Sequence, residues 1–314
     1  MILILSATND NTTNEVIDWL TFYKKNWLRI NETDPIKVEL VLKNQTVKVL
    51  IETPSQKFRL DDIETYWYRK GNFNFSWKLD EALKTSVFID QLEYHLKHEI
   101  STLQSFLHLL LYKKKGIGNY LTAAPNKLYV LTLAQKAGLE IPETHITNLP
   151  NYTLNGGKQW ISKAMWEAIH LMKPEYGAIQ AYTSALPEGS TTKTHFPSLF
   201  QHAIPKNYEV RVFFLDQKCY AMAIFSQMAA KTVLDYRNYN KERPNRVVPY
   251  KLPKQLTKKI RNLMNDLKLK SGSIDLIATK NGGYVFLEVN PVGQFGMVSR
   301  PCNYPLEQYV ANYL

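Results

Sequence analysis

Three side chains that carry oxygen donors are spaced to meet on one hairpin in the last third of the sequence. Asn281-Gly282 is the strongest short signal for a two-residue type I′ turn between two strands. That turn places Asp275 directly across from Glu288, and the two-residue period of a strand puts Asn290 on the same face. Carboxylate and amide oxygens suit Mg²⁺ that holds the phosphates of a nucleotide. The spacing therefore predicts a metal site.

The alternative for these carboxylates is a solvated polar face on an edge hairpin. Apolar residues on both predicted faces argue against it, because Ile277 and Phe286 would share the face of Asp275. The opposite face would carry Ile274, Leu276, Ala278, Val285, Leu287 and Val289. Since buried carboxylates need a partner or a metal, a metal site is the preferred interpretation.

The length and composition are those of a globular protein. A chain of 314 residues can bury a sizeable core, and the usual domain size predicts about two or three domains. No window approaches about twenty consecutive apolar residues, so we expect no membrane span and a cytoplasmic location. Cys219 and Cys302 are far apart in the sequence, which argues against a disulfide framework and a zinc site.

The net charge is +11 at pH 7. Such a surplus favours negatively charged partners, among them nucleotides, acidic peptides, nucleic acid and anionic lipid. The basic residues are spread along the chain and form no compact nucleic-acid-binding motif, so we expect no nucleic-acid partner. A dispersed surplus is equally consistent with an ordinary hydrated surface.

The elements that must position these residues alternate between strands and helices, which predicts an α/β (α+β) fold. In the first third we expect strands at 2–5, 38–42, 47–51 and 66–68, a helix beginning at the capping box Thr12-x-x-Glu15, and one or two long helices over 79–115 that end at a boundary, Gly116-Ile117-Gly118. The rest predicts helices at 125–137, 253–267 and 306–313, and strands at 143–147, 160–164, 178–184, 198–204, 210–215 and 220–225.

Two lysines upstream of the hairpin are candidates for anion binding. Lys127 lies in the first turn of a predicted helix, and Lys163 lies in a predicted strand between apolar residues. A buried lysine needs an anion, whereas a surface strand carries lysine freely. His108, among leucines on the long helix, is predicted to be a core residue. His95 and His98 on the same helix have the spacing of metal ligands but lack the His-Glu-x-x-His order, so we expect no metal site there.

Several motifs resemble the ATP-grasp fold. The run Phe200-Gln201-His202-Ala203-Ile204, followed by Tyr208-Glu209-Val210-Arg211-Val212, is similar to its hinge and following strand. With Lys127, Lys163 and the predicted metal ligands, the order matches from about residue 120 onward. The tail 286–295, Trp67-Tyr68-Arg69-Lys70-Gly71 and Leu234-Asp235-Tyr236-Arg237 resemble the peptide-modifying branch that makes microviridin-type peptides, the graspetide synthetases, and the segments 1–6 and 27–31 resemble its grasp-with-spasm members.

The resemblance implies three parts and a set of site residues. These are a pre-ATP-grasp domain at 1–118, a middle domain at 119–197 and a C-terminal domain at 198–314, with ATP between the last two. The ATP phosphates would contact Lys127 and Lys163, and the adenine would lie at Gln201, His202 and Ile204. Glu209 would bind the ribose, and Arg211 would neutralise the transferred phosphoryl group. Two Mg²⁺ ions would be held by Asp275, Glu288 and Asn290. Family members commonly have an acidic residue in place of His202.

The implied activity is ATP-dependent macrocyclisation of an acidic precursor peptide that has a leader and a core. An Asp or Glu side chain of the peptide would be activated as an acyl phosphate and joined to a Thr or Ser hydroxyl or to a Lys amine. Asp235 is the candidate general base and Arg237 its catalytic neighbour, although the two could equally form a surface pair. A homodimer is left open. The rival hypotheses are another ATP-grasp ligase that joins an amino acid or amine to a carboxylate, and a non-catalytic protein that binds acidic peptides or nucleic acid.

Overall fold

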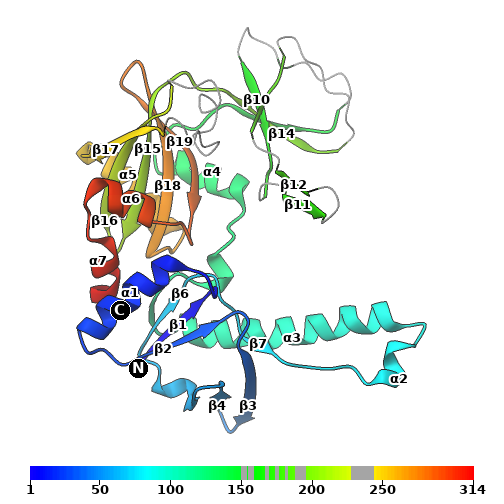
Figure 1. Cartoon of the computed structure of the whole chain (residues 1–314). Coiled ribbons are helices and arrows are strands. Elements are labelled where there is room, and N and C mark those ends of the chain that lie inside the picture. The colour runs from blue at the N-terminus through cyan, green and yellow to red at the C-terminus, as the bar shows by residue number, and fades with distance from the viewer. Residues whose placement is uncertain are drawn as a thin grey trace. The chain divides into compact units, whose positions relative to one another are not determined.

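The computed structural model describes most of the chain, and its residues form two compact units (Figure 1). The described residues are 1–149, 154, 159–166, 170–173, 177–180, 183–187, 196–227 and 244–314. Unit 1 comprises Met1–Ala124, Gln294–Gly296 and Pro305–Leu314, and unit 2 comprises Pro125–Gly293 and Met297–Tyr304. The predicted domain boundaries at 118 and 197 stay predictions.

Unit 1 is built on a parallel sheet with the strand order β2-β1-β6-β8. Its strands are β1 (Ile2–Ser6), β2 (Trp27–Asn31), β6 (Thr65–Tyr68) and β8 (Lys115–Ile117), so the predicted boundary at Gly116 lies in an edge strand. The helix α1 (Asn11–Phe22) connects β1 to β2. The predicted capping box is wrong, because Asp10 is the N-cap and its side chain accepts the Thr13 N–H at 3.0 Å.

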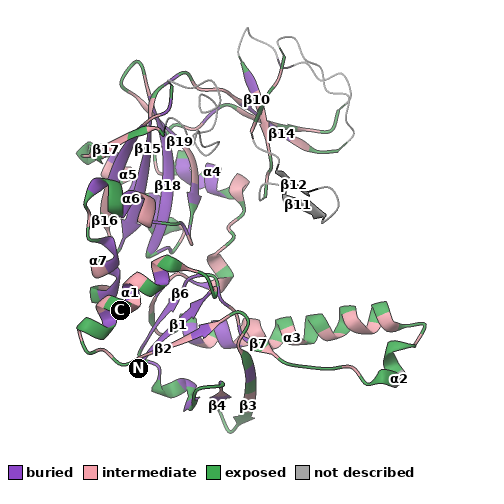
Figure 2. Ribbon diagram, viewed as in Figure 1, coloured by how far each residue is buried: buried purple, intermediate pink, exposed green. Residues whose placement is uncertain are grey.

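A second sheet of unit 1, with the order β5-β4-β3-β7, contains the predicted strand pair. Its strands are β3 (Pro35–Lys43), β4 (Thr46–Glu52), β5 (Lys57–Arg59) and β7 (Asn74–Phe75). The helices of this unit are α2 (Glu81–Lys84), α3 (Ile89–Tyr112) and α7 (Leu306–Tyr313), with short 3₁₀ turns at Leu60–Asp62 and Tyr120–Thr122. Only the last turns of α3 are buried, as Figure 2 shows.

His108 on α3 is a core residue, as predicted. It is 1% exposed, its Nε2 lies 3.0 Å from Asn72 Oδ1, and its ring stacks on Tyr120. Burial lowers the pKa of His108 to about 4, because a charged imidazole is not solvated there. His95 and His98 on the same helix are exposed.

Unit 2 contains an antiparallel five-stranded sheet with the order β17-β16-β15-β18-β19. Its strands are β15 (Lys206–Leu215), β16 (Lys218–Phe225), β17 (Arg246–Tyr250), β18 (Ser271–Thr279) and β19 (Tyr284–Asn290). The helices α4 (Lys127–Lys136) and α5 (Lys254–Asp266) pack against one face, where Val212, Ile274 and Phe286 join their apolar residues in one core. The opposite face carries three of the predicted site residues, Arg211, Asp275 and Glu288.

A smaller sheet of unit 2 has the order β13-β10-β14-β9. Its strands are β9 (Thr144–Thr147), β10 (Trp160–Lys163), β13 (Ser184–Ala185) and β14 (Ser198–His202); the pair β11 (His170–Lys173) and β12 (Gly177–Gln180) and the helix α6 (Gly296–Cys302) complete the elements. The strand predicted at 178–184 agrees with β12 at 178–180, residues 181–182 lie outside the described residues, and residue 183 is in neither strand.

In the described part of the chain, every helix is too short or too polar to cross a membrane. Cys219 and Cys302 are free thiols, as expected. The cytoplasmic location stays a prediction.

Candidate active site

The hairpin between β18 and β19 has a different turn from the predicted one. Thr279 N–H donates to Gly283 O at 2.9 Å, and Gly282 N–H donates to Thr279 O at 3.0 Å. The loop therefore has three residues, 280–282, and only Gly282 among them has a positive φ, of 82°. A type I′ turn would need positive φ at both Asn281 and Gly282. The two-residue turn is therefore wrong, and the strands nearest the loop are paired one residue out of the predicted register.

A bulge restores the predicted register where the site begins. Leu276 pairs with Phe286, but Asp275 pairs with Glu288, so Leu287 is an extra residue on β19. The Phe286 N–H donates instead to Glu140 O at 2.7 Å. Asp275 therefore faces Glu288 as predicted. Asn290 pairs with Ser273, two residues further along the strands.

The bulge also changes which side chains of β19 are in the core. Phe286 and Val289 pack with α4 and α5. Phe286 was expected to share the face of Asp275, and Val285 and Leu287 were expected on the opposite one. That assignment is wrong, because one extra residue reverses the alternation on one side of the bulge.

Arg211 on β15 lies beside Asp275 in register and binds it. The Arg211 Nη1 donates to both Asp275 Oδ1 and Oδ2 at 2.9 Å. The side chains are 8% and 11% exposed, so the pair is almost fully removed from water. A charge-assisted contact of this kind compensates the cost of burying both groups. The predicted phosphoryl-binding arginine and one predicted metal ligand are thus direct neighbours.

Glu209 lies two residues before Arg211 and so on the same face of β15. Lys206 Nζ donates to its Oε1 at 2.7 Å, and Ser226 Oγ donates to its Oε2 at 2.7 Å. Burial raises the pKa of Glu209, although Lys206 and Ser226 lower it, and the charge of Asp275 raises it further. The influence of Asp275 places both carboxylates in one electrostatic environment. The ribose contact predicted for Glu209 stays a prediction.

Sequence reasoning missed Lys206 and Ser226 as partners of Glu209. Residues three apart on a regular strand point to opposite faces, so Lys206 gave no signal. A register shift between Lys206 and Tyr208 brings the two side chains together. Ser226 follows β16, and only the pairing of β15 with β16 brings it near.

The two predicted phosphate-binding lysines and Glu288 line one pocket. Lys127 is the first residue of α4, and Lys163 is the last residue of β10. The pocket also includes Val130 and Leu287. The Lys127 Nζ lies 3.9 Å from Glu288 Oε2, with side chains 38% and 20% exposed. Elements from three separate stretches of chain thus bring two cations and a carboxylate to one place, as the predicted ATP site requires.

Asn126 fixes the start of α4 and with it the position of Lys127. Its Oδ1 accepts the N–H groups of Leu128 and Tyr129 at 3.0 and 3.1 Å. This cap satisfies two of the free N–H groups in the first turn. The helix therefore begins at Lys127 and directs its first turn to the pocket.

The predicted adenine-binding residues lie on β14 and in the loop that follows it. Gln201 is buried, and its Nε2 donates to Thr144 Oγ1 on β9 at 2.9 Å. The His202 N–H donates to Glu143 O at 2.9 Å, so this backbone donor is engaged in a hydrogen bond within the protein. Adenine contacts at Gln201, His202 and Ile204 stay a prediction. Asp235 and Arg237 lie outside the described residues.

The three predicted metal ligands suit Mg²⁺. Asp275 and Glu288 are directly opposite each other, and Asn290 is exposed one step along the strand. Two carboxylates and an amide are hard oxygen donors that leave coordination positions for phosphate and water. Nowhere in the described ranges do three or more His, Cys, Asp or Glu side chains gather as metal ligands. In the predicted metal site, the amide of Asn290 would be the third ligand.

Comparison with known proteins identifies the fold. No model of a protein family and no curated protein matches the sequence. Among solved structures, a RiPP-associated ATP-grasp ligase from Chryseobacterium gregarium, in complex with ADP and a leader and core peptide, matches with a TM-score of 0.80 and 21% identity over 100% of this chain and 96% of that chain. The chain has the ATP-grasp fold.

Two further ATP-grasp structures match over almost the whole chain. The macrocyclase MdnC from Microcystis aeruginosa MRC, bound with the precursor peptide MdnA, has a TM-score of 0.76 and 24% identity over 100% of this chain and 99% of that chain. The ligase PsnB, with a phosphomimetic variant of its minimal precursor, Mg and ADP, has a TM-score of 0.68 and 17% identity over 99% of this chain and 96% of that chain. The ATP-grasp fold predicted from the Gln201 to Arg211 region is confirmed.

Proposed function

We propose that the protein is an ATP-dependent carboxylate ligase that closes rings in a ribosomally made precursor peptide. The observation that carries the proposal is the pocket lined by Lys127, Lys163 and Glu288, with Asp275 opposite Glu288. The three similar structures support the peptide as substrate, since each was solved with a precursor or with its leader and core. ATP and Mg²⁺ are proposed on the same grounds, because PsnB was solved with ADP and Mg.

Activation of the peptide is the first step of the proposed reaction. A carboxylate is a poor electrophile, so an Asp or Glu side chain of the peptide takes the γ-phosphoryl group of ATP and ADP leaves. The resulting acyl phosphate has a good leaving group. Lys127 and Lys163 would neutralise the phosphate oxygens, and Asp275, Glu288 and Asn290 would hold up to two Mg²⁺ ions. Bound Mg²⁺ would neutralise charge on the phosphates.

Ring closure is the second step. A Thr or Ser hydroxyl, or a Lys amine, of the same peptide attacks the activated carbonyl, and inorganic phosphate leaves. Arg211 would bind the phosphoryl oxygens as they gain charge. Asp235 is the proposed base for a hydroxyl nucleophile, with Arg237 beside it. The product is an ester or an amide bond between two side chains.

The net charge of +11 supports an acidic precursor peptide as the partner. A basic protein attracts an acidic peptide before contact and raises its rate of association. We also propose a cytoplasmic location and leave a homodimer open. The proposed reaction does not depend on either.

Trapping the acyl phosphate tests the proposed chemistry. The protein is incubated with ATP, Mg²⁺ and a short acidic peptide encoded next to its gene, in the presence of hydroxylamine. Hydroxylamine converts an activated carboxyl group into a hydroxamate, which mass spectrometry locates on an Asp or Glu side chain of the peptide. A peptide without hydroxamate under conditions where the protein binds ADP would overturn carboxylate activation. ATP turnover with an added free amine would instead indicate another ATP-grasp ligase.

A further inference from the structure

The segment that follows β19 returns to unit 1 for three residues. Gln294–Gly296 belongs to unit 1, although Gly293 before it and Met297 after it belong to unit 2. The middle residue, Phe295, is 2% exposed. The guanidinium carbon of Arg69 lies 5.8 Å from the centre of its ring. A cation and an aromatic face at this distance attract each other, and more strongly when both are out of water.

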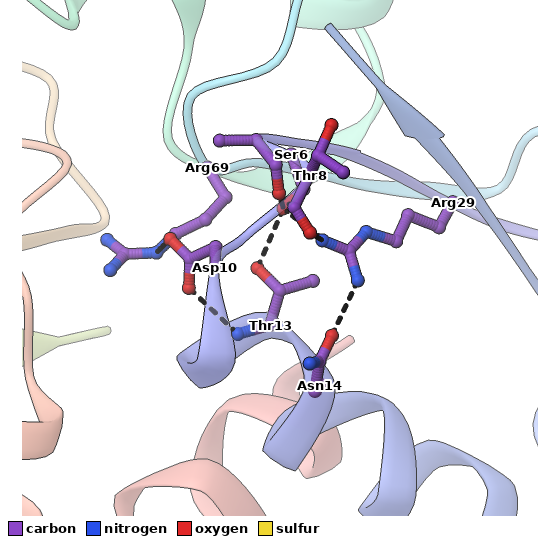
Figure 3. A network of polar contacts seen from close by, with 8 residues as sticks. Ser6, Thr8, Asp10, Thr13, Asn14, Arg29 and Arg69 are labelled. Carbon is purple, nitrogen blue, oxygen red and sulfur yellow. Dashed lines mark hydrogen bonds and ion pairs between the residues drawn. The ribbon is translucent and has the colours of Figure 1, made fainter. Parts of the chain in front are cut away.

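Arg69 is also held by contacts with β1 and with the start of α1. Its side chain is 3% exposed, and its Nε lies 3.1 Å from Asp10 Oδ2. Asp10 also caps α1, because its Oδ1 accepts the Thr13 N–H (Figure 3). The backbone N–H of Arg69 donates to Leu5 O at 2.8 Å. The guanidinium that meets Phe295 is therefore fixed by β1 and by the start of α1.

This cluster of Asp10, Arg69 and Phe295 occupies a typical ligand-binding position. Arg69 follows β6 directly, and β1 and β6 are adjacent parallel strands whose next partners in the sheet, β2 and β8, lie in opposite directions. Open parallel sheets bind ligands at the carboxyl ends of such strands. Here the chain places its own Phe295 against the arginine at that edge. Arg69 therefore contacts the protein itself, which favours a structural task over direct substrate binding.

The backbone between the end of β19 and Phe295 has little conformational freedom. The Gly293 N–H donates to Asn290 O at 3.0 Å, and Pro291 restricts its own φ. A Cβ at Gly293 would lie 2.4 Å from the side chain of Ser273, the residue that pairs with Asn290. Gly293 is thus packed directly onto the neighbouring strand. A displacement of Phe295 would be transmitted to Asn290 through this tight turn.

We propose that Arg69 is a positioning residue for the metal and nucleotide site. By holding Phe295, it fixes the chain that leaves β19 and keeps Glu288 and Asn290 in place. This inference rests on the proposed function, because it concerns the site assigned to Mg²⁺ and ATP. It gives a task to two motifs that the proposed chemistry does not use, the one around Arg69 and the extension from Pro291 to Phe295.

Binding of ADP in the presence of Mg²⁺ to the full chain tests the proposal by calorimetry. Phe295→Leu removes the ring and keeps an apolar side chain, and we expect it to weaken binding about tenfold. Phe295→Tyr keeps the ring and is expected to retain most of the wild-type affinity for ADP. Arg69→Lys keeps the charge but loses the planar group, so it should also weaken binding. With precursor peptide, these weakened variants should raise KM for ATP more than they lower kcat.

Arg29→Lys is the matched control. Arg29 lies in the same polar network, but its guanidinium hydrogen-bonds to Asn14 Oδ1 and to Ala7 O, near the start of α1. This variant should lower the melting temperature without changing the affinity for ADP. If Phe295→Leu fails to fold, the ADP affinities of Arg69→Lys and Arg29→Lys test the inference instead. Equal ADP affinity in Arg69→Lys and wild type would overturn the inference, whereas a wild type that binds no ADP would overturn the proposed function as well.

Discussion

Arg211 and Asp275 form a two-point contact in which one guanidinium nitrogen lies 2.9 Å from both carboxylate oxygens. The two residues are 64 apart in sequence and meet because β15 and β18 are paired in register. A metal ion at Asp275 would use the same oxygens that Arg211 contacts. The pair therefore links the affinity for Mg²⁺ to the position of the arginine that would stabilise the transferred phosphoryl group.

Replacing Arg211 by Met should separate these two effects. The substitution removes the positive charge that contacts the Asp275 oxygens, so Mg²⁺ should bind there about three- to tenfold more tightly. The buried carboxylate loses the Arg211 contact, and the free energy of unfolding should fall by about 3 kcal/mol. Calorimetry and urea unfolding measure the two quantities. Arg211→Lys keeps the charge and should hold Mg²⁺ affinity near that of the wild type; weaker Mg²⁺ binding by Arg211→Met would refute the competition.

The pH dependence of stability should report His108. Its folded-state pKa of about 4 lies below the unfolded value of about 6.5, so the neutral form is favoured by folding. The stabilisation is complete above pH 6.5 and is lost as the pH falls toward 4, by up to about 3 kcal/mol. Replacing His108 with Gln should flatten the thermal stability of the protein across this range. Replacing the exposed His95 with Gln is the control and should leave the pH profile unchanged.

The turn of the β18–β19 hairpin can be tested at Gly282. Its φ of 82° strains any residue with a Cβ, although a Cβ there would meet no atom within 4 Å. We expect Gly282→Ala to lower the free energy of unfolding by about 1 kcal/mol, and Gly282→Asn to cost less because Asn tolerates this conformation. Denaturant unfolding compares the two variants. Equal stability of Gly282→Ala and wild type would contradict the three-residue loop.

Affinity for the precursor peptide should depend on salt. The surplus of +11 attracts an acidic peptide through charges that added salt screens over about 8 to 10 Å. Fluorescence anisotropy of a labelled peptide should show weaker binding as NaCl is raised from 50 to about 300 mM. A neutral peptide in which Asp and Glu are replaced by Asn and Gln serves as the control. Affinity that does not change with salt would show that contacts other than charge select the peptide.

Local patterns predicted the strands and helices well where the apolar period was regular, as in β1, β15 and α5. Local patterns did not predict the irregularities in strand pairing. The pairing of Asp275 with Glu288 was predicted correctly, yet it results from two departures that cancel, a longer turn and the bulge at Leu287. The edge strand β17 was missed, since Pro249 weakens the strand signal of its short sequence.

The candidate site was predictable residue by residue but not contact by contact. Residue type and order pointed to Lys127, Lys163 and Glu288, which the structure brings to one pocket. The Arg211 to Asp275 contact depends on the register of strands far apart in the chain, and the Lys206 to Glu209 contact depends on a bulge. Neither register nor bulges can be read from a two-residue period alone.

The mass of the precursor peptide after incubation with the protein, ATP and Mg²⁺ tests the central claim most directly. Each ring closed removes one water, so the wild type should lower the peptide mass by about 18 Da per ring. Glu288→Gln keeps the size of the side chain and removes the charge of a proposed metal ligand, so the variant should leave the peptide mass unchanged, and its melting temperature shows that it is folded. A peptide whose mass stays the same with wild-type protein that binds ADP and Mg²⁺ would contradict the account.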